Sequence, residues 1–232
     1  MITLLNIETS GQACSVAVTQ DGQVEFEKIE REGMQHAVCL APFVDEAMAW
    51  FRRHDIKPDA VAVSIGPGSY TGLRIGLSMA KGLCFGLDVP LIGVSTLQII
   101  ATQAMFAHYD WQGDELLVPM IDARRMEVYT ATYNFRLDAV EPPRPVILDE
   151  ESYADLLGDG KQLYFLGDGA KKAKDVIKRD GAHFMPDLRP LAHGMMSLAE
   201  KAYKEQRFLN LAYCVPEYLK EFQATVPRNK LF

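Results

Sequence analysis

Three stretches of the sequence carry residue types that hold phosphate groups in other proteins. Gly66-Pro-Gly-Ser-Tyr-Thr-Gly72 follows an apolar run and precedes a helical pattern, so an anion could bind at the start of that helix. Its glycine spacing, GxGxxxG, is one residue longer than the dinucleotide-binding fingerprint, and the chain contains no GxxxxGKS/T motif. A tight turn, with Ser69 or Thr71 capping the helix, explains the same residues without a ligand.

The other two stretches each follow a predicted strand. Glu8-Thr9-Ser10 combines a carboxylate with two hydroxyls, which could contact a phosphate or a metal-bound water. Gly167-Asp168-Gly169 lies between a strand and a helix, where backbone N–H groups could cradle a ribose or phosphate. A plain turn is the alternative for each. Asp122-Ala-Arg-Arg125 ends a further strand, where its charges face a predicted cleft or form an Asp122–Arg124 salt bridge.

Residues for metal binding or covalent catalysis form no recognised pattern. The closest two of the five histidines, His183 and His193, are ten residues apart, so a helical i, i+4 ligand pair is missing. The sequence has no GxSxG motif, and its four cysteines are scattered without a CxxC pair. We therefore expect no catalytic residue and no metal site on this chain.

Composition narrows the class of protein further. The chain has 232 residues and a net charge of −7, which disfavours a module that binds RNA strongly by itself. No apolar run approaches the roughly 20 residues that span a bilayer, and the N-terminus has no signal-peptide pattern. Isolated cysteines in apolar surroundings suit reduced thiols. We expect a cytoplasmic protein without membrane contact.

The elements that position these residues form two lobes. Residues 1–109 read as βββαβαβα, with strands at 3–7, 14–19, 24–29, 60–65 and 90–94 and helices at 35–53, from about 69, and 95–108. Residues 110–220 read as a second lobe of similar order, with strands at 116–121, 127–134, 140–148 and 163–166 and helices at 149–157, from 170, and 193–206. Residues 221–232 form a C-terminal tail.

The helix that begins near Ser69 has small residues every four positions. Gly72, Gly76 and Ala80 share one stripe, and Gly82 and Gly86 repeat the spacing on another. A glycine inside a helix costs about 1 kcal/mol relative to alanine. Close packing of another backbone against the helix would offset that cost.

Four stretches together closely resemble the bacterial TsaB (YeaZ) family, and the resemblance runs from Met1 to about Lys220. They are residues 66–76, 92–97, 121–129 and 216–220. The resemblance implies an α/β, two-lobed sugar kinase/Hsp70/actin-like (ribonuclease H-like) fold, each lobe a mixed sheet with flanking helices. It also implies a role in making the threonylcarbamoyl modification of the adenosine next to the tRNA anticodon. In this family the paralogue TsaD performs the transfer with a metal-binding histidine pair, and the ATPase TsaE joins the complex.

By this resemblance the chain is a non-catalytic subunit that dimerises with TsaD, or with itself when alone, and meets tRNA only through the complex. It implies no cofactor for the chain itself and leaves ATP or ADP at the interface of the assembled complex open. The implied vestigial nucleotide contacts are Glu8, Thr9, Ser10, Gly167 and Gly169. The implied partner interface is formed by Gly72, Leu73, Gly76, Leu77, Ala80 and His36.

One alternative stays open. A stand-alone small-molecule phosphotransferase of the same superfamily would need a carboxylate near the γ-phosphate, and only Glu8 and Asp122 are placed to supply it. Glu8 stands where the superfamily carries aspartate, which weakens that alternative.

Overall fold

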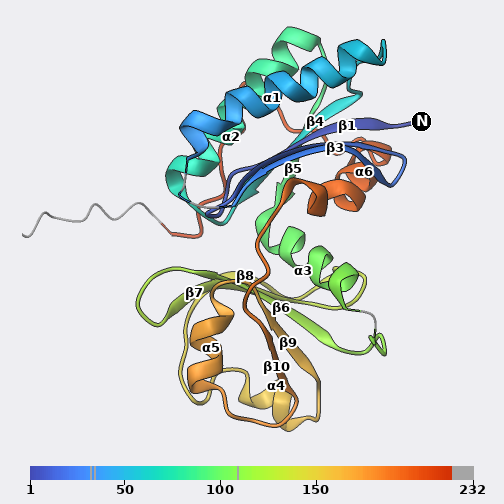
Figure 1. Cartoon of the computed structure of the whole chain (residues 1–232). Helices are drawn as coiled ribbons and strands as arrows, with labels where there is room; N and C mark the ends of the chain where they lie inside the picture. The colour runs from blue at the N-terminus through green and yellow to red at the C-terminus, as the bar shows by residue number, and fades with distance from the viewer. Residues whose placement is uncertain (32, 34, 109, 221–232) are drawn as a thin grey trace, which may run out of the picture.

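Two five-stranded sheets form the two lobes of the protein, with helix α3 (Thr96–Ala107) between them (Figure 1). The structure, a computed structural model, describes residues 1–31, 33, 35–108 and 110–220. The predicted tail at 221–232 lies outside the described residues. In the part of the chain that is described, no helix is long and apolar enough to cross a membrane.

The first lobe has the predicted order βββαβαβα. Its elements are β1 (Thr3–Glu8), β2 (Cys14–Gln20), β3 (Gln23–Glu30), α1 (His36–Arg53), β4 (Ala60–Gly66), α2 (Tyr70–Leu87), β5 (Leu91–Ser95) and α3. The strand order is β3-β2-β1-β4-β5, and β1 pairs antiparallel with β2 and parallel with β4. Asp21 and Gly22 both have positive φ, as the two-residue turn between β2 and β3 requires.

The second lobe repeats this topology strand for strand. Its elements are β6 (Leu116–Asp122), β7 (Glu127–Tyr133), β8 (Ala139–Ile147), α4 (Ala154–Gly158), β9 (Leu163–Leu166), α5 (Ala170–Val176) and β10 (Ala182–Met185). The order β8-β7-β6-β9-β10 has the same parallel and antiparallel pairs as the first sheet. This duplication confirms the predicted fold. Strand β10 was not predicted, because its four mostly half-buried residues show no clear alternation of apolar and polar side chains.

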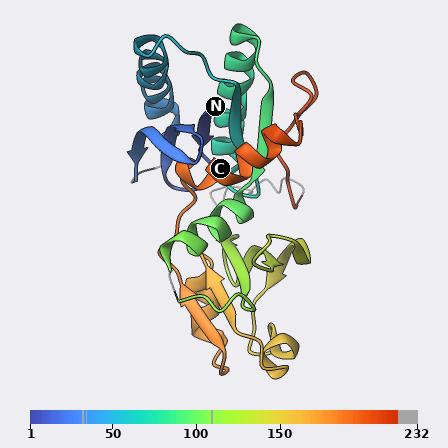
Figure 2. The ribbon, with the colours of Figure 1, turned by 90° about the vertical axis from the view of Figure 1, so that its right-hand side faces the viewer.

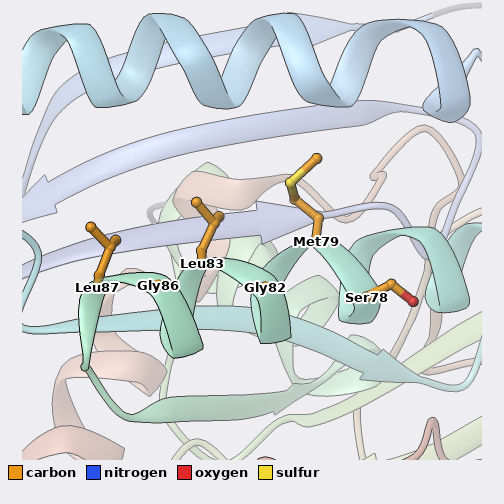
Figure 3. Close-up of a pocket in the computed structure, with 6 residues that line it drawn as sticks. All are labelled: Ser78, Met79, Gly82, Leu83, Gly86 and Leu87. Carbon is orange, nitrogen blue, oxygen red and sulfur yellow. The ribbon is translucent and has the colours of Figure 1, made fainter.

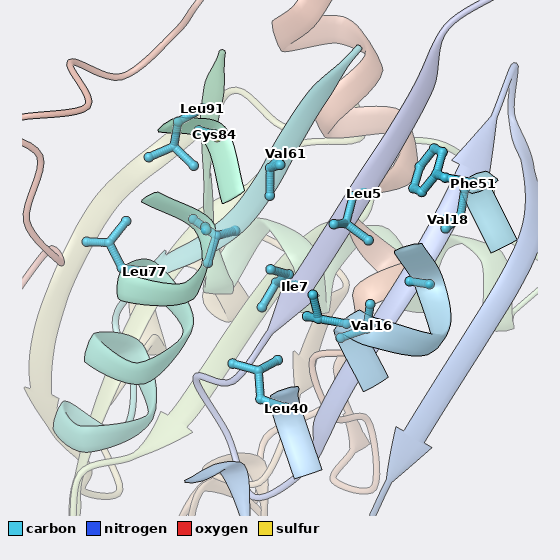
Figure 4. Packing of buried hydrophobic residues seen from close by; sticks show 14 of the residues in the cluster. Leu5, Ile7, Val16, Val18, Leu40, Phe51, Val61, Leu77, Cys84 and Leu91 are labelled. Carbon is cyan, nitrogen blue, oxygen red and sulfur yellow. The ribbon is translucent and has the colours of Figure 1, made fainter. Parts of the chain in front are cut away.

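Both faces of the first sheet are covered, which explains the continuous apolar runs in its central strands. Leu5 and Val61 point to the face covered by α1 and α2, where Phe51 joins them (Figure 4). Leu4 and Ala62 belong to the cluster on the opposite face. Neighbouring residues of β1 and β4 thus serve two separate cores, as the period of two in a strand dictates.

Helix α3 belongs to both lobes. Ile99 packs into the cluster on the first sheet. Leu97 and Ile100 pack instead against Leu117 and Ala131 of the second sheet. A helix that is apolar on most of its circumference is expected to be buried on more than one side. Thus α3 forms the hydrophobic joint between the two sheets.

The prediction that the second lobe includes all of residues 110–220 is wrong for the last part of this range. After β10 the chain returns to the first lobe through the 3-10 helix η1 (Ala192–Met195) and α6 (Met196–Lys204), drawn in orange-red in Figure 2. Met195, Ala199 and Ala202 complete the second core of the first sheet. Further on, Leu209 bridges to Leu91 of β5. The apolar face of α6 predicts that the helix packs against a sheet, but the sequence of α6 does not indicate which of the two sheets.

We predict that a fragment of residues 1–109 does not fold by itself. Without η1 and α6, the face of the first sheet that carries Leu4, Ala62 and Ile92 is exposed to water. The fragment should show no cooperative thermal transition by circular dichroism, whereas residues 1–220 should show one. A cooperative transition in the fragment would refute this assignment of the lobe boundary.

Candidate functional site

The Glu8-Thr9-Ser10 loop lies at the end of β1 and is buried inside the first lobe. Glu8 has no exposed surface, and its Oε1 accepts hydrogen bonds from the Ser10 backbone N–H at 2.5 Å and the Ser64 hydroxyl at 3.0 Å. Among the described residues, no group hydrogen-bonds to Glu8 Oε2. The carboxyl is thus half-satisfied within the protein.

Burial raises the pKa of Glu8 to about 6, and the hydrogen bonds from Ser10 and Ser64 act in the opposite direction. No salt bridge to Glu8 occurs within the described part of the chain, where the ten ion pairs involve other residues. An ionised carboxylate in this position destabilises the fold, because a buried charge without a cation keeps little of its solvation.

The loop packs directly on the first two turns of α2. Thr9 Oγ1 donates to the Gly72 carbonyl at 2.8 Å, and the Ser69 N–H donates to the Ser10 carbonyl at 2.7 Å. A Cβ on Gly72 would overlap the Thr9 carbonyl oxygen, and one on Gly76 would overlap Thr9 Oγ1. The backbone of the loop and that of the helix are therefore in contact, with no space between them for a phosphate.

The predicted cap of α2 is confirmed. Ser69 is the N-cap residue, and its hydroxyl accepts a hydrogen bond from the Gly72 N–H at 3.2 Å. Of the two explanations for residues 66–72, the turn with a cap accounts for the geometry. The helix ends at Leu87, and the next residue, Asp88, is its C-cap in the left-handed conformation.

On the second lobe, the residues expected at a cleft bond mainly to one another. The Asp122 N–H donates to Asp168 Oδ1 at 2.9 Å, and Lys172 Nζ contacts Asp122 Oδ1 at 2.7 Å. Burial raises the pKa of Asp168, and the negative charge of Asp122 adds to this shift. The expected Asp122–Arg124 salt bridge is wrong, because only the backbone N–H of Arg124 reaches Asp122, at 2.6 Å.

Packing within the second lobe explains why residues 167 and 169 are glycines. A Cβ on Gly167 would lie 2.6 Å from the Met120 carbonyl oxygen, and one on Gly169 would lie 2.9 Å from Met120 Cβ. Both glycines let this turn pack on β6. Contact of either glycine, or of Glu8, Thr9 and Ser10, with a nucleotide stays a prediction.

The predicted partner interface does not lie at the surface. Its members on α2 are all buried in this chain, namely Gly72, Leu73, Gly76, Leu77 and Ala80. His36 is also buried, with Nε2 3.2 Å from the Ala13 carbonyl oxygen. The assignment of these six residues to an interface is therefore wrong. The residue that approaches Gly72 and Gly76 is Thr9 of the same chain, through its carbonyl oxygen at Gly72 and its side chain at Gly76.

The outer side of α2 carries the second glycine stripe. Apart from the adjacent residues and the backbone of α2 itself, no described atom lies within 4 Å of a Cβ placed on Gly82 or Gly86, and both residues are exposed. They belong to a shallow apolar groove of about 550 Å³ (Figure 3), lined by Ser78, Met79, Gly82, Leu83, Gly86 and Leu87. Phe85, between the two glycines in sequence, is 83% exposed. The spacing of Gly82 and Gly86 was visible in the sequence, but its outward direction was not.

The lining of this groove contains no titratable side chain, so the groove suits docking rather than acid–base chemistry. Over the described residues, no group of three or more His, Cys, Asp or Glu side chains is arranged to hold a metal ion. The four cysteines are free, and burial raises the pKa of Cys14 to about 12 and of Cys84 to about 11. Such thiols are poor nucleophiles at neutral pH.

The sequence of this chain is similar to those of known proteins. The family described as "TsaD: tRNA N6-adenosine threonylcarbamoyltransferase" matches residues 30–147. Two similar proteins are named "tRNA threonylcarbamoyladenosine biosynthesis protein TsaB". That of Escherichia coli (strain K12) is 31% identical over 226 residues, with 94% of each chain covered. That of Bacillus subtilis (strain 168) is 30% identical over 232 residues, with 96% of each chain covered.

Two solved structures from Pseudomonas aeruginosa resemble the whole fold. "YeaZ" has a TM-score of 0.76 and 31% identity, over 94% of this chain and 100% of that chain. A protein described as uncharacterized "with similarity to peptidase YEAZ" also has a TM-score of 0.76, with 29% identity over 95% and 100% of the two chains. The similarity thus includes both lobes and the return of the chain to the first lobe.

We predict opposite effects for the two glycine stripes of α2. Gly76→Ala should lower the free energy of unfolding by about 2–3 kcal/mol, because the new methyl group overlaps Thr9. Gly82→Ala should raise it by about 0.5–1 kcal/mol, because the site is open and alanine favours the helix. Urea unfolding followed by circular dichroism measures both. Equal effects of the two substitutions would contradict the packing described here.

Glu8 should make stability depend on pH. Its folded-state pKa of about 6 lies above the ordinary value of 4.5, so the folded protein binds the proton more tightly than the unfolded chain. Stability should therefore fall as pH rises from about 4 to about 7, by about 2 kcal/mol from this group. Glu8→Gln should remove this contribution. The difference in unfolding free energy between variant and parent should then grow by that amount over this range.

The control for this experiment is Glu25→Gln, which changes an exposed carboxylate on β3. It removes one carboxylate charge without changing the packed core. If the difference in unfolding free energy between Glu8→Gln and the parent did not change between pH 4 and pH 7, the buried carboxyl would not titrate as described.

Proposed function

Because the chain belongs to the TsaB (YeaZ) family of tRNA threonylcarbamoyladenosine biosynthesis proteins, we propose that it is a non-catalytic subunit of a tRNA-modifying complex. Its partner is a TsaD-type threonylcarbamoyltransferase. It docks on this partner through the exposed side of α1 and α2, with the groove from Ser78 to Leu87 at the centre. The subunit supports the transferase and meets tRNA only within the complex.

The observation that carries this proposal is the pair of open glycines on α2. Gly82 and Gly86 each cost the helix about 1 kcal/mol, and no contact among the described residues explains them. Beside them are the apolar groove and Phe85, which is large, apolar and 83% exposed. A partner helix that packs closely on this face would use the space the glycines leave and cover Phe85.

A transferase of the TsaD type is the expected partner because its family matches residues 30–147 of this chain. This range includes α1 and α2, so such a partner carries an equivalent helix pair. Two related faces can then pair around an approximate twofold axis. The same geometry permits a homodimer when the chain is alone.

The absence of catalysis by this subunit is supported by the state of its loops. The Glu8-Thr9-Ser10 loop is buried under the first turns of α2, and Asp122 is engaged by Lys172. The stand-alone phosphotransferase is therefore not favoured, since Glu8 is fully buried and Asp122 is paired with Lys172. Peptide cleavage through the thiol of Cys14 or Cys84 is also unsupported, because burial raises the pKa of both.

The other components follow from the same proposal. A TsaE-type ATPase joins the assembled complex, and ATP or ADP binds at an interface of that complex rather than in the packed loop of this chain. With a net charge of −7, the chain leaves most phosphate contacts of tRNA to its partners. Such a complex acts in the cytoplasm.

The test reconstitutes the modification from purified components, with Gly82→Leu and Gly86→Leu combined in this chain. The two side chains should block the partner helix and weaken association by about tenfold or more, with a matching loss of modified tRNA. Gly158→Leu is the matched control, because this glycine is also part of a helix and faces open space, but it lies in the second lobe. Full product without this chain would overturn the proposal, as would unchanged association of the double variant.

A further inference from the structure

A segment near the C-terminal end runs along the side of α2 that faces away from α1. This strap, residues 209–220, is tied to the first lobe along its length. Lys81 Nζ contacts the carbonyl oxygens of Ala212 and Cys214, at 3.4 and 3.0 Å. The Glu217 N–H donates to the Ile65 carbonyl at 2.7 Å, next to Gly66, where a Cβ would lie 2.6 Å from the Glu217 carbonyl oxygen.

The end of the strap is held by side chains of the first turns of α2. The Tyr218 ring lies 5.1 Å from that of Tyr70, and Arg74 Nε donates to Tyr218 Oη at 3.0 Å. Arg74 also lies over the Tyr70 ring, 4.1 Å from its centroid. Beyond this cluster, Lys220 forms an ion pair with Glu127 of the second lobe. The strap therefore has a defined backbone position.

Side chains of the strap divide into two groups. Leu209, Leu211 and Cys214 pack against the core between the first sheet and α2. Tyr213 and Val215 point away from it, and they are 83% and 70% exposed. We call these two residues the ridge. A fixed backbone that presents a tyrosine and a valine to solvent has the composition of a contact site, since aromatic anchors dominate protein interfaces.

The ridge is continuous with the proposed docking face. On a helix, residues three or four positions apart are neighbours, so Lys81, which holds the strap, adjoins Phe85 and Ser78. Phe85 in turn adjoins Gly82, at the edge of the groove. The exposed side of α2 therefore has the groove on one flank and the strap on the other.

We infer that the ridge is a second contact surface for the transferase-type partner and favours that partner over a second copy of this chain. This inference rests on the proposed function. The transferase family matches residues 30–147 only, so the strap lies outside what the match shares. In a pair of otherwise similar faces, a feature contributed by one side distinguishes the unlike pair from the like pair.

The test is a double substitution of the ridge, Tyr213→Ser with Val215→Thr, in the full chain. Both residues are exposed, so folding should be unaffected, and a thermal melt checks this. Binding to a purified TsaD-type transferase, measured by calorimetry, should weaken about tenfold. Self-association, measured by sedimentation velocity, should change less than twofold. The matched control is Val140→Ser with Ile147→Thr, two exposed apolar residues of β8 in the second lobe.

The outcomes separate this inference from the proposal on which it rests. If the groove variants lose the transferase and the ridge variant binds it normally, the inference is wrong and the docking face stands. If the ridge variant loses both associations equally, the ridge does not discriminate between partners and the inference is also wrong. If the parent chain itself does not bind the transferase, the proposed function fails.

Discussion

The contact between Thr9 and the first two turns of α2 is the constraint on which the rest of the first lobe depends. Gly72 and Gly76 have no side chain, so the loop after β1 can touch the helix backbone and bond to it through Thr9 Oγ1. This contact fixes the rotation of α2 about its own axis. Leu73, Leu77 and Ala80 then face the core, and Gly82, Phe85 and Gly86 face outward. The outward direction of the docking face thus depends on the contact between Thr9 and Gly72, which are 63 positions apart in the sequence.

The same contact explains why the loops that the sequence predicts as nucleotide contacts are packed here. In the first lobe, α2 packs directly on the loop after β1, and burial raises the pKa of Glu8 in this loop. In the second lobe, Asp122 and Asp168 are joined through a backbone N–H, and Lys172 neutralises Asp122. In these loops, the buried side-chain atoms without a hydrogen-bond partner among the described residues are Glu8 Oε2 and Ser10 Oγ.

Local signals in the sequence were sufficient for much of the fold. The order of the first lobe and the Ser69 cap follow from periodicity and residue type, and both are confirmed. The return of α6 to the first lobe was not predictable in this way, because an amphipathic helix reports that one face is buried but not against which sheet. The partner of Asp122 was missed for a similar reason, since Lys172 is distant in sequence.

The choice between the two glycine stripes shows where prediction from sequence ends. Both stripes have the same spacing and the same propensity cost, so residue type cannot tell which one packs inside the chain. The structure separates them by what surrounds each position, with Thr9 against Gly72 and Gly76 and open space at Gly82 and Gly86. A glycine that is needed for packing inside the chain gives no information about a partner. A glycine without such a contact among the described residues does give information about a partner. On α2 the glycines of this second kind are the two beside the apolar groove and Phe85.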